Sequence, residues 1–226
     1  LAHEIKNPLT PIQLAIQEVA EKYDGHDEPY AKILATAREV IEEEVATLRR
    51  LTAEFSAFAR LPQVEPSPTD LGEFLDECQA AFEAEAAEHG VRLVWRKPPA
   101  PLLLSLDRQM MRRAMDNLVR NAVEALAAVA GESKTVEIEG GPSREPGRAW
   151  IVVRDNGPGI APDAHEHIFE PYFTTKAGGT GLGLAIVKKI VLEHHGEIEV
   201  ESGAAGTVFR LALPLAGTET GRASGA

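Results

Sequence analysis

Near the start of the chain, an imidazole with a carboxylate beside it has the chemistry that a phosphoryl acceptor needs. His3, Asn7 and Thr10 lie at positions i, i+4 and i+7 of a helical pattern and therefore share one helix face. An exposed neutral imidazole is a nucleophile, and the neighbouring carboxylate of Glu4 can take its proton or orient the ring. For an isolated His-Glu pair, however, a solvated surface histidine is the better interpretation. The assignment of His3 therefore depends on the rest of the chain.

Two asparagines further along the chain are suited to contact phosphates. Asn117 and Asn121 are one helical turn apart and face the same way. Carboxamide oxygens can coordinate Mg²⁺ and contact phosphates without adding repulsive charge. Taken alone, the pair is explained better by a solvated polar helix face.

A glycine-containing turn follows the apolar run 150–154. Asp155 stands at the end of this expected strand, where its carboxylate can accept a hydrogen bond from the exocyclic amine of adenine. Gly157 and Gly159 allow the backbone to approach a ring closely. Because Asp-Asn-Gly is also favourable in ordinary turns, this motif alone is a weak signal.

The most glycine-rich segment, residues 178–184, opens an expected helix. Free N–H groups and the helix dipole make such a helix start an anion site that suits phosphate oxygens. The segment superficially resembles a dinucleotide fingerprint. No strand immediately precedes it and no βαβ unit surrounds it, so we reject a Rossmann fold.

Between these two glycine motifs lies the segment 168–177. Phe169 and Phe173 can anchor a mobile segment in the core, while Lys176 can reach a phosphate. Polar residues between anchored ends suit a lid over a nucleotide. The alternative is a structural loop whose aromatic side chains simply pack.

The elements that must position these residues begin with a helical hairpin. Residues 1–61 read as two amphipathic helices joined at the polar stretch 24–29. A lone hairpin cannot cover both of its apolar stripes, so we predict that it dimerises into a four-helix bundle. The stripes comprise Ile5, Leu9, Ile12, Ile16, Val19 and Tyr23 in the first helix, and Leu34, Ala37, Ile41, Val45, Leu48, Leu51, Phe55 and Phe58 in the second.

The prolines of residues 62–69 indicate an interdomain linker, and residues 70–216 then change to a mixed pattern of helices and strands. We expect a mixed sheet with helices on one face, a two-layer sandwich, which makes the whole chain α+β. Residues 217–226 have no apolar pattern and are predicted to be disordered. The expected helices span 70–89, 108–130 and 182–195, and the expected strands span 91–96, 101–106, 135–139, 149–154, 197–202 and 206–213.

Composition limits the classes of function. The 226 residues carry a formal net charge of −12, which argues against nucleic acid as a partner. No apolar run approaches the roughly 18 residues of a membrane span, and no signal peptide is recognisable, so we expect no membrane contact by this segment. The single Cys78 fits a reducing compartment, and its apolar surroundings predict a buried thiol. The histidines expected at the surface, without zinc-ligand spacing, are His26, His89, His165, His167, His194 and His195.

Five motifs, in this order, resemble those of the sensor histidine kinases of two-component systems, over the span from His3 to about residue 215. The extended first motif and the short lid look most like the nitrogen-regulation group of these kinases. The phosphoacceptor, N, G1, F and G2 boxes of that family correspond here to HEIKNPLTPI, NLVRNAVEA, DNGPGI, FEPYF and GTGLGL.

The resemblance implies a homodimeric protein histidine kinase with a GHKL-type (Bergerat) ATP-binding domain, which uses ATP and Mg²⁺. His3 would be phosphorylated with Glu4 as general base, and a response regulator receiver domain would then accept the phosphoryl group on an aspartate. Asn7 would position water for dephosphorylating that partner, so phosphatase activity is also expected. A protein of this kind acts in the bacterial cytoplasm. Because Leu1 already lies inside a helical pattern, we expect an N-terminally truncated fragment, whose missing region decides whether the full-length protein is membrane-anchored.

In the nucleotide site, the resemblance implies that Asn121 coordinates Mg²⁺ and that Asn117 lies close to the phosphates. Asp155 would bind the adenine amine, in a pocket shaped by Gly157 and Gly159. The remaining expected nucleotide contacts are Ile160, Lys176, Gly179, Thr180, Gly181, Leu182, Gly183 and Leu184.

Two positions, Glu124 and Asn117, bear on whether the chain is a kinase, an ATPase that hydrolyses ATP with water, or a scaffold without activity. Many family members carry a lysine where this chain has Glu124, which puts one phosphate contact in doubt, although Arg120 or Lys176 can substitute. The related ATPases of the gyrase, mismatch-repair and heat-shock chaperone group use a glutamate one turn before the Mg²⁺ asparagine to activate water. Asn117 occupies that position and cannot act as a base, which favours transfer to a protein side chain over hydrolysis. A degenerate kinase kept as a dimeric scaffold is the non-enzymatic alternative.

Overall fold

The chain, described by a computed structural model, divides into two compact units. One unit combines residues 1–62 with residues 174–182, and the other combines residues 63–173 with residues 183–226. The described residues are 2–23, 25, 27–59, 63–127, 129, 133–176 and 179–217, without the side chains of 2–9, 50, 51 and 53–59.

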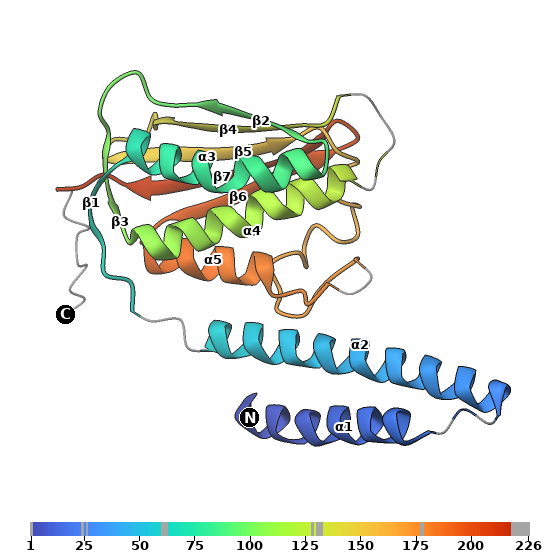
Figure 1. Cartoon of the computed structure of the whole chain (residues 1–226). Helices are drawn as coiled ribbons and strands as arrows, with labels where there is room; N and C mark the ends of the chain where they lie inside the picture. The colour runs from blue at the N-terminus through green and yellow to red at the C-terminus, as the bar shows by residue number, and fades with distance from the viewer. Residues whose placement is uncertain are drawn as a thin grey trace. The chain divides into compact units, whose positions relative to one another are not determined.

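The first unit is built on two long helices, α1 (Ala2–Lys22) and α2 (Glu28–Ala59). They run antiparallel and side by side (Figure 1). Nε2 of Gln17 on α1 donates a hydrogen bond to Oε1 of Glu42 on α2 at 3.1 Å. Both helices expected between residues 1 and 61 are therefore present, and their dimerisation stays a prediction.

Among its described residues, the second unit contains a five-stranded sheet in the order β2-β4-β5-β7-β6. The pair β2–β4 is parallel and the pairs β4–β5, β5–β7 and β6–β7 are antiparallel, which confirms the predicted mixed sheet. The strands are β2 (Arg92–Arg96), β4 (Thr135–Pro142), β5 (Arg148–Asp155), β6 (Glu197–Gly203) and β7 (Gly206–Pro214).

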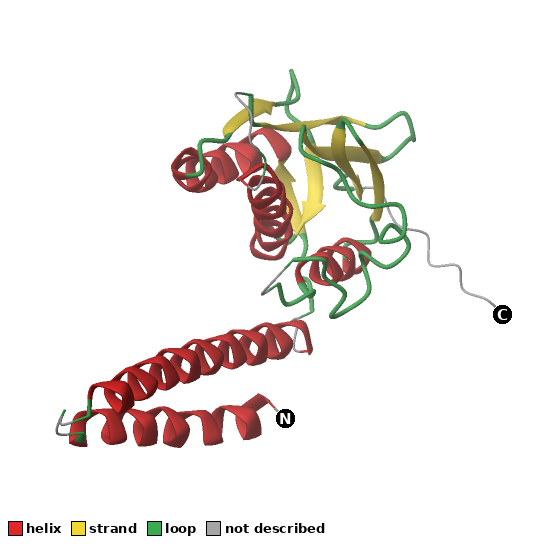
Figure 2. Ribbon diagram, turned by 90° about the vertical axis from the view of Figure 1, so that its right-hand side faces the viewer, coloured by secondary structure: helices red, strands yellow, loops and turns green. Residues whose placement is uncertain are grey.

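One face of this sheet is covered by α3 (Leu71–Glu88), α4 (Arg108–Ala127) and α5 (Gly183–Glu193), as expected for a two-layer sandwich (Figure 2). Side chains in a strand alternate between faces, so every second residue of β7 points the same way. Phe209, Leu211 and Leu213 are all buried, as are Met111 and Leu118 of α4. The core of the unit therefore lies between the sheet and these helices.

The predicted linker over residues 62–69 is wrong at its C-terminal end. Strand β1 (Ser67–Asp70) begins inside it and pairs antiparallel with β3 (Leu103–Leu106) in a separate two-stranded sheet. Pro68 is tolerated there because each strand of a two-stranded sheet is an edge, where a missing N–H leaves no ladder broken. Ser67, Pro68 and Thr69 therefore belong to a folded ribbon.

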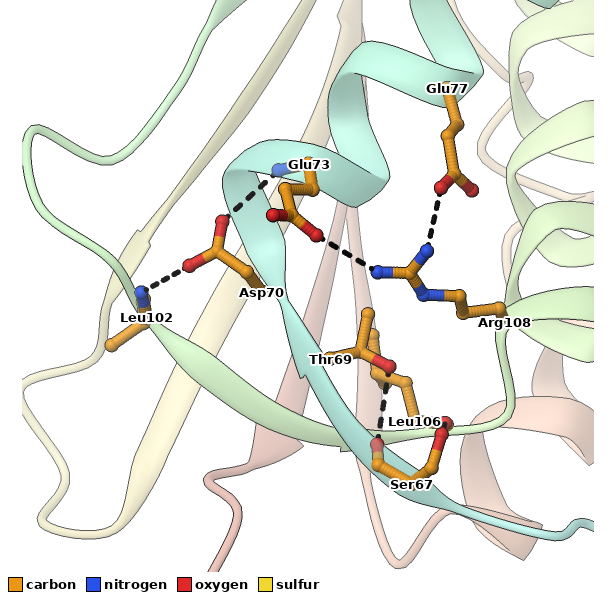
Figure 3. Close-up of polar contacts among 8 residues, drawn as sticks. All are labelled: Ser67, Thr69, Asp70, Glu73, Glu77, Leu102, Leu106 and Arg108. Carbon is orange, nitrogen blue, oxygen red and sulfur yellow. Dashed lines mark hydrogen bonds and ion pairs between the residues drawn. The ribbon is translucent and has the colours of Figure 1, made fainter.

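Asp70 fixes the point at which β1 turns into α3. Its Oδ1 accepts a hydrogen bond from the Glu73 N–H at 3.1 Å as the N-cap, and its Oδ2 accepts from the Leu102 N–H at 3.0 Å (Figure 3). Arg108, the first residue of α4, forms ion pairs with Glu73 and Glu77 of α3. Exposed pairs of this kind contribute little to stability. The Asp70 carboxylate is therefore the stronger link between α3 and the segment before β3.

The boundaries of the other elements differ slightly from the predicted ones. Helix α4 ends at Ala127 and α5 begins at Gly183 rather than at residue 182. Most of the predicted disordered tail, residues 218–226, lies outside the described residues. None of the described helices is both long enough and apolar enough to cross a bilayer.

The prediction of a surface position is wrong for His194, which is only 1% exposed. Its Nδ1 lies 2.7 Å from the Ile190 carbonyl oxygen, and its Nε2 accepts a hydrogen bond from the Asp107 N–H at 2.9 Å. A neutral ring with both nitrogens paired can be buried without an unsatisfied polar atom. The prediction of a buried thiol at Cys78 is confirmed.

Candidate functional site

Asp155, the last residue of β5, is buried, with 8% of its surface exposed. Its Oδ1 accepts hydrogen bonds from the Gly157 N–H at 2.8 Å and from the Thr207 N–H at 3.3 Å. These two backbone donors fix the direction in which the carboxylate points. An oriented carboxylate at a strand end can accept a hydrogen bond from an amine, and the contact of Asp155 with adenine stays a prediction.

The turn after Asp155 is held by contacts to two other strands. The Asn156 side chain accepts from the Thr135 N–H at 2.9 Å and donates to the Ser133 carbonyl oxygen at 2.6 Å, which ties the turn to the start of β4. Gly159 has a φ of +77°, and a Cβ built on it would lie 2.1 Å from the carbonyl oxygen of Gly203 at the end of β6. Only glycine fits this position.

The same turn also packs against α4. A Cβ built on Gly157 would lie 3.5 Å from Cδ2 of Leu126 and 3.8 Å from Cβ of Ala125. Ala125 is one turn after Asn121, so α4 carries the asparagine pair and also contacts the turn of Asp155. The asparagine pair and the turn of Asp155, which are far apart in sequence, therefore both lie along α4, from its middle to its C-terminal end.

Asn117 is buried on α4, with 6% of its surface exposed. Its Nδ2 donates to the Arg113 carbonyl oxygen at 2.8 Å, and its Oδ1 accepts from Nη2 of Arg120 at 3.1 Å. A Cβ built on Gly183, the first residue of α5, would lie 3.0 Å from this Oδ1 and 3.9 Å from Nδ2 of Asn121. Both carboxamides therefore face the N-terminus of α5.

This arrangement fits a nucleotide with its metal ion. The N-terminus of α5, residues Gly183 and Leu184, presents N–H groups of the kind that bind phosphate. Mg²⁺ usually takes few protein ligands and completes its shell with water and substrate phosphates, so the single amide oxygen of Asn121 is a suitable ligand. Arg120 adds a cation near this end of the site, although it also pairs with Asp116 at 3.4 Å.

The expected lid residues Lys176, Gly179, Thr180, Gly181 and Leu182 belong to the first unit. Within that segment, the Lys176 N–H donates to Oγ1 of Thr174 at 3.1 Å, and the Gly179 N–H donates to the Lys176 carbonyl oxygen at 3.1 Å. Gly181 has a φ of +67°. Their contact with a nucleotide stays a prediction.

The acceptor residues His3, Glu4 and Asn7 lie on α1, and their side chains are outside the described part of the chain. The nearest described member of the motif is Thr10, whose Oγ1 accepts a hydrogen bond from Nη2 of Arg49 on α2 at 3.2 Å. Their roles also stay predictions.

Sequence patterns did not point to Ser202 and Thr207. The Thr207 N–H orients Asp155, and Oγ of Ser202 accepts a hydrogen bond from the N–H of half-buried Ile160 at 2.8 Å. The only available signal was the Gly-Thr pair at the start of the last expected strand, which resembles an ordinary hairpin.

The fold and the site together are those of the ATP-binding domain that histidine kinases share with related ATPases. Residues 106–217 match the family described as histidine kinase-, DNA gyrase B-, and HSP90-like ATPase. The chain is 32% identical to the catalytic domain of the histidine kinase ThkA, with a TM-score of 0.58 over 67% of this chain and 96% of that one. ThkA in complex with the response regulator protein TrrA matches at 27% identity, with a TM-score of 0.66 over 95% of this chain and 59% of that one.

Two curated relatives come from the nitrogen-regulation group. Nitrogen regulation protein NtrY of Azorhizobium caulinodans is 35% identical over 95% of this chain and 28% of its own length. The sensory histidine kinase/phosphatase NtrB of Rhodobacter capsulatus is 32% identical over 97% of this chain and 61% of its own length. The chain therefore spans less than two thirds of the length of either relative. On the matches to the family model, to these relatives and to the ThkA catalytic domain, the chain belongs to the sensor histidine kinase family.

Proposed function

We propose that this chain is the catalytic core of an ATP-dependent protein histidine kinase. It phosphorylates His3 and passes the phosphoryl group to an aspartate of a response regulator receiver domain. The observation that carries the proposal is the placement of Asn117, Asn121 and Gly183 around the start of α5. That arrangement joins an anion-binding helix terminus to a metal-binding amide in one domain.

In the proposed nucleotide complex, Asp155 accepts a hydrogen bond from the adenine amine, and the N–H groups at Gly183 and Leu184 bind phosphate oxygens. Asn121 would hold Mg²⁺, which would supply neutralising charge for the transferring group. The buried amide of Asn117 adds no negative charge beside the phosphates. Arg120, bonded to that amide, compensates for Glu124, where many relatives carry a lysine.

In the transfer step, a neutral ring nitrogen of His3 attacks the γ-phosphorus of ATP. An N–P bond forms, the P–O bond to ADP breaks, and Glu4 takes or orients the ring proton. In the second step, an aspartate oxygen of the receiver attacks the same phosphorus and the imidazole leaves. The chain contributes positioning and charge to both steps, which is what phosphoryl transfer requires.

Hydrolysis of ATP by water is the competing reaction on this fold. It needs a base one helical turn before Asn121, and that position is Asn117. Both of its polar side-chain atoms are hydrogen-bonded within the protein, to Arg113 and Arg120. A carboxamide has no basic oxygen at neutral pH, so Asn117 favours transfer to a side chain.

The proposed homodimer forms through α1 and α2. Within one chain, Leu34 and Val45 of the predicted stripe are buried, whereas Ile12, Val19 and Leu48 remain 47%, 49% and 40% exposed. Large apolar side chains in a row along a hairpin are covered when two hairpins pair. The exposed half of the stripe therefore supports a four-helix bundle made by two copies.

The proposal of a response regulator as partner rests on the motif around His3 and on what two related kinases bind or act on. The related kinase ThkA forms a complex with the response regulator protein TrrA, and NtrB is described as a kinase and phosphatase. For this chain we propose the same kind of partner, with Asn7 positioning the water that removes phosphate from it.

Phosphotransfer profiling tests this proposal. The protein is labelled with Mg-ATP, freed of nucleotide and mixed with a panel of purified receiver domains. We expect the label to move within seconds to one preferred receiver and to become an acyl phosphate. Steady release of inorganic phosphate from ATP, with no label on the protein or on any receiver, would instead identify an ATPase.

A further inference from the structure

The end of the β6–β7 hairpin lies directly against the turn that follows Asp155. Ser202 of β6 is opposite Thr207 of β7 in the antiparallel register. The contact between Gly159 and Gly203 is backbone against backbone, since a Cβ on Gly159 would lie 2.1 Å from the Gly203 carbonyl oxygen. The turn therefore has little freedom to move without the hairpin.

The hydroxyl of Ser202 joins the hairpin to the turn. Its Oγ lies 2.8 Å from the Ile160 nitrogen, 3.0 Å from Oγ1 of Thr207 and 3.3 Å from the Gly206 carbonyl oxygen. A hydroxyl can donate once and accept twice. Ile160 N–H must donate and the Gly206 carbonyl must accept, so the Thr207 hydroxyl donates to Ser202. One side chain thus uses its full hydrogen-bonding capacity here.

The hairpin holds both ends of the turn. At its start, the Thr207 N–H donates to Oδ1 of Asp155, and at its end, the Ile160 N–H donates to Ser202. The two pairs are separated by 52 and 42 residues in sequence, so they form only when the sheet is complete. The shape of the turn is therefore set by the hairpin as well as by its own glycines.

We propose that Ser202 is a positioning residue for nucleotide binding, an inference that rests on the proposed function. It acts through Ile160 and the Asp155 turn rather than by touching the nucleotide. Without the hydroxyl, the Ile160 N–H loses its partner and the turn samples shapes that do not accept adenine. The apparent dissociation constant then rises in inverse proportion to the fraction of protein that remains competent to bind.

The test compares Ser202→Ala with a matched serine at the other end of the sheet. Oγ of Ser143 also accepts a backbone N–H, from Glu145 at 3.1 Å, in the turn between β4 and β5. We expect Ser202→Ala to bind a fluorescent ATP analogue roughly five- to tenfold more weakly, the worth of one lost hydrogen bond. Amide exchange in residues 156–160 should accelerate, and the KM for ATP should rise while kcat is kept. Ser143→Ala should match wild type, and Ser202→Thr should recover most of the affinity.

Binding by Ser202→Ala within twofold of wild type, or an equal loss in Ser143→Ala, overturns the role of Ser202. A fall in kcat with an unchanged KM overturns it as well. If wild type itself does not bind the analogue, the proposed function fails together with this role. If wild type binds and only the variant comparison fails, the proposed function stands and the role of Ser202 does not.

Discussion

Gly183 and Asn117 approach so closely that a methyl group on Gly183 would lie 3.0 Å from Oδ1 of Asn117. Gly183 is the first residue of α5, and Asn117 is buried on α4. The glycine therefore lets the amide reach the start of the helix, where N–H groups are available for phosphate. The conformation of the Asn117 side chain depends on this missing Cβ.

Gly183→Ala should weaken Mg-ATP binding by about tenfold while the fold is kept. Alanine is the better helix former, so the stability of α5 should not fall, but the Asn117 amide must shift away from the helix start. Nucleotide titration and thermal melting of the variant check this. Gly203→Ala is the control, because a Cβ there meets nothing within 4 Å. Unchanged affinity in Gly183→Ala would contradict the role of this contact.

Gly159→Ala should destabilise the second unit far more than Gly90→Ala. Both glycines have positive φ, +77° and +67°, so both substitutions cost about 1 kcal/mol of backbone strain. At Gly90 the new Cβ meets nothing, whereas at Gly159 it meets the Gly203 carbonyl oxygen at 2.1 Å. We expect a further loss of more than about 2 kcal/mol, measured by urea unfolding. Equal losses in the two variants would show that the turn moves freely away from the hairpin.

Asn121→Ala should reduce autophosphorylation by at least about a hundredfold, because Mg²⁺ and the charge of the transferring group lose their protein ligand. The thermal midpoint should change little, since Asn121 is only half-buried at the helix surface. Gln79→Ala, which removes an exposed carboxamide from α3, serves as the control. Wild-type labelling rates in Asn121→Ala would remove this residue from the mechanism.

Burial raises the pKa of the Cys78 thiol to about 12, so the native protein should resist thiol reagents at pH 8 and react once unfolded in urea. The sign of the pH effect follows from linkage. The unfolded thiol ionises near its ordinary pKa and the folded one does not. Stability is therefore unaffected below about pH 9 and falls between there and pH 12, by about 1.4 kcal/mol per pH unit. Cys78→Ala should lack this fall, and rapid labelling of native protein would contradict the burial.

Much of the fold follows from local patterns. The mixed order of expected helices and strands after residue 70 predicted a mixed sheet with helices on one face, and both features are confirmed. The start of α3 was predicted to within one residue, from the change of pattern after the prolines of the linker. Strand β1 was missed because Pro68 argues against a strand, and only its pairing with β3 makes it one.

The chemistry of single residues pointed only weakly to the candidate site. Asp155 after a strand and the Asn117/Asn121 pair were singled out by residue type, but only the combination of motifs and the family resemblance gave them roles, which stay predictions. Ser202 and Thr207 were not singled out, since their contribution is a hydrogen bond to a residue 42 or 52 positions away. His194 was misplaced for the same reason, because its burial depends on partners such as Asp107, 87 positions away. Long-range pairing of this kind leaves no local sequence pattern.

The phosphorylation state of His3 tests the central claim most directly. The protein is incubated with Mg-ATP labelled at the γ-phosphate. The stability of the protein-bound label is measured in acid and in alkali, and the labelled residue is located by peptide mass spectrometry. We expect an alkali-stable, acid-labile phosphate on His3 in wild type, and none in His3→Gln although it still binds nucleotide. Absence of label in wild type, or label that persists in His3→Gln, would contradict the account.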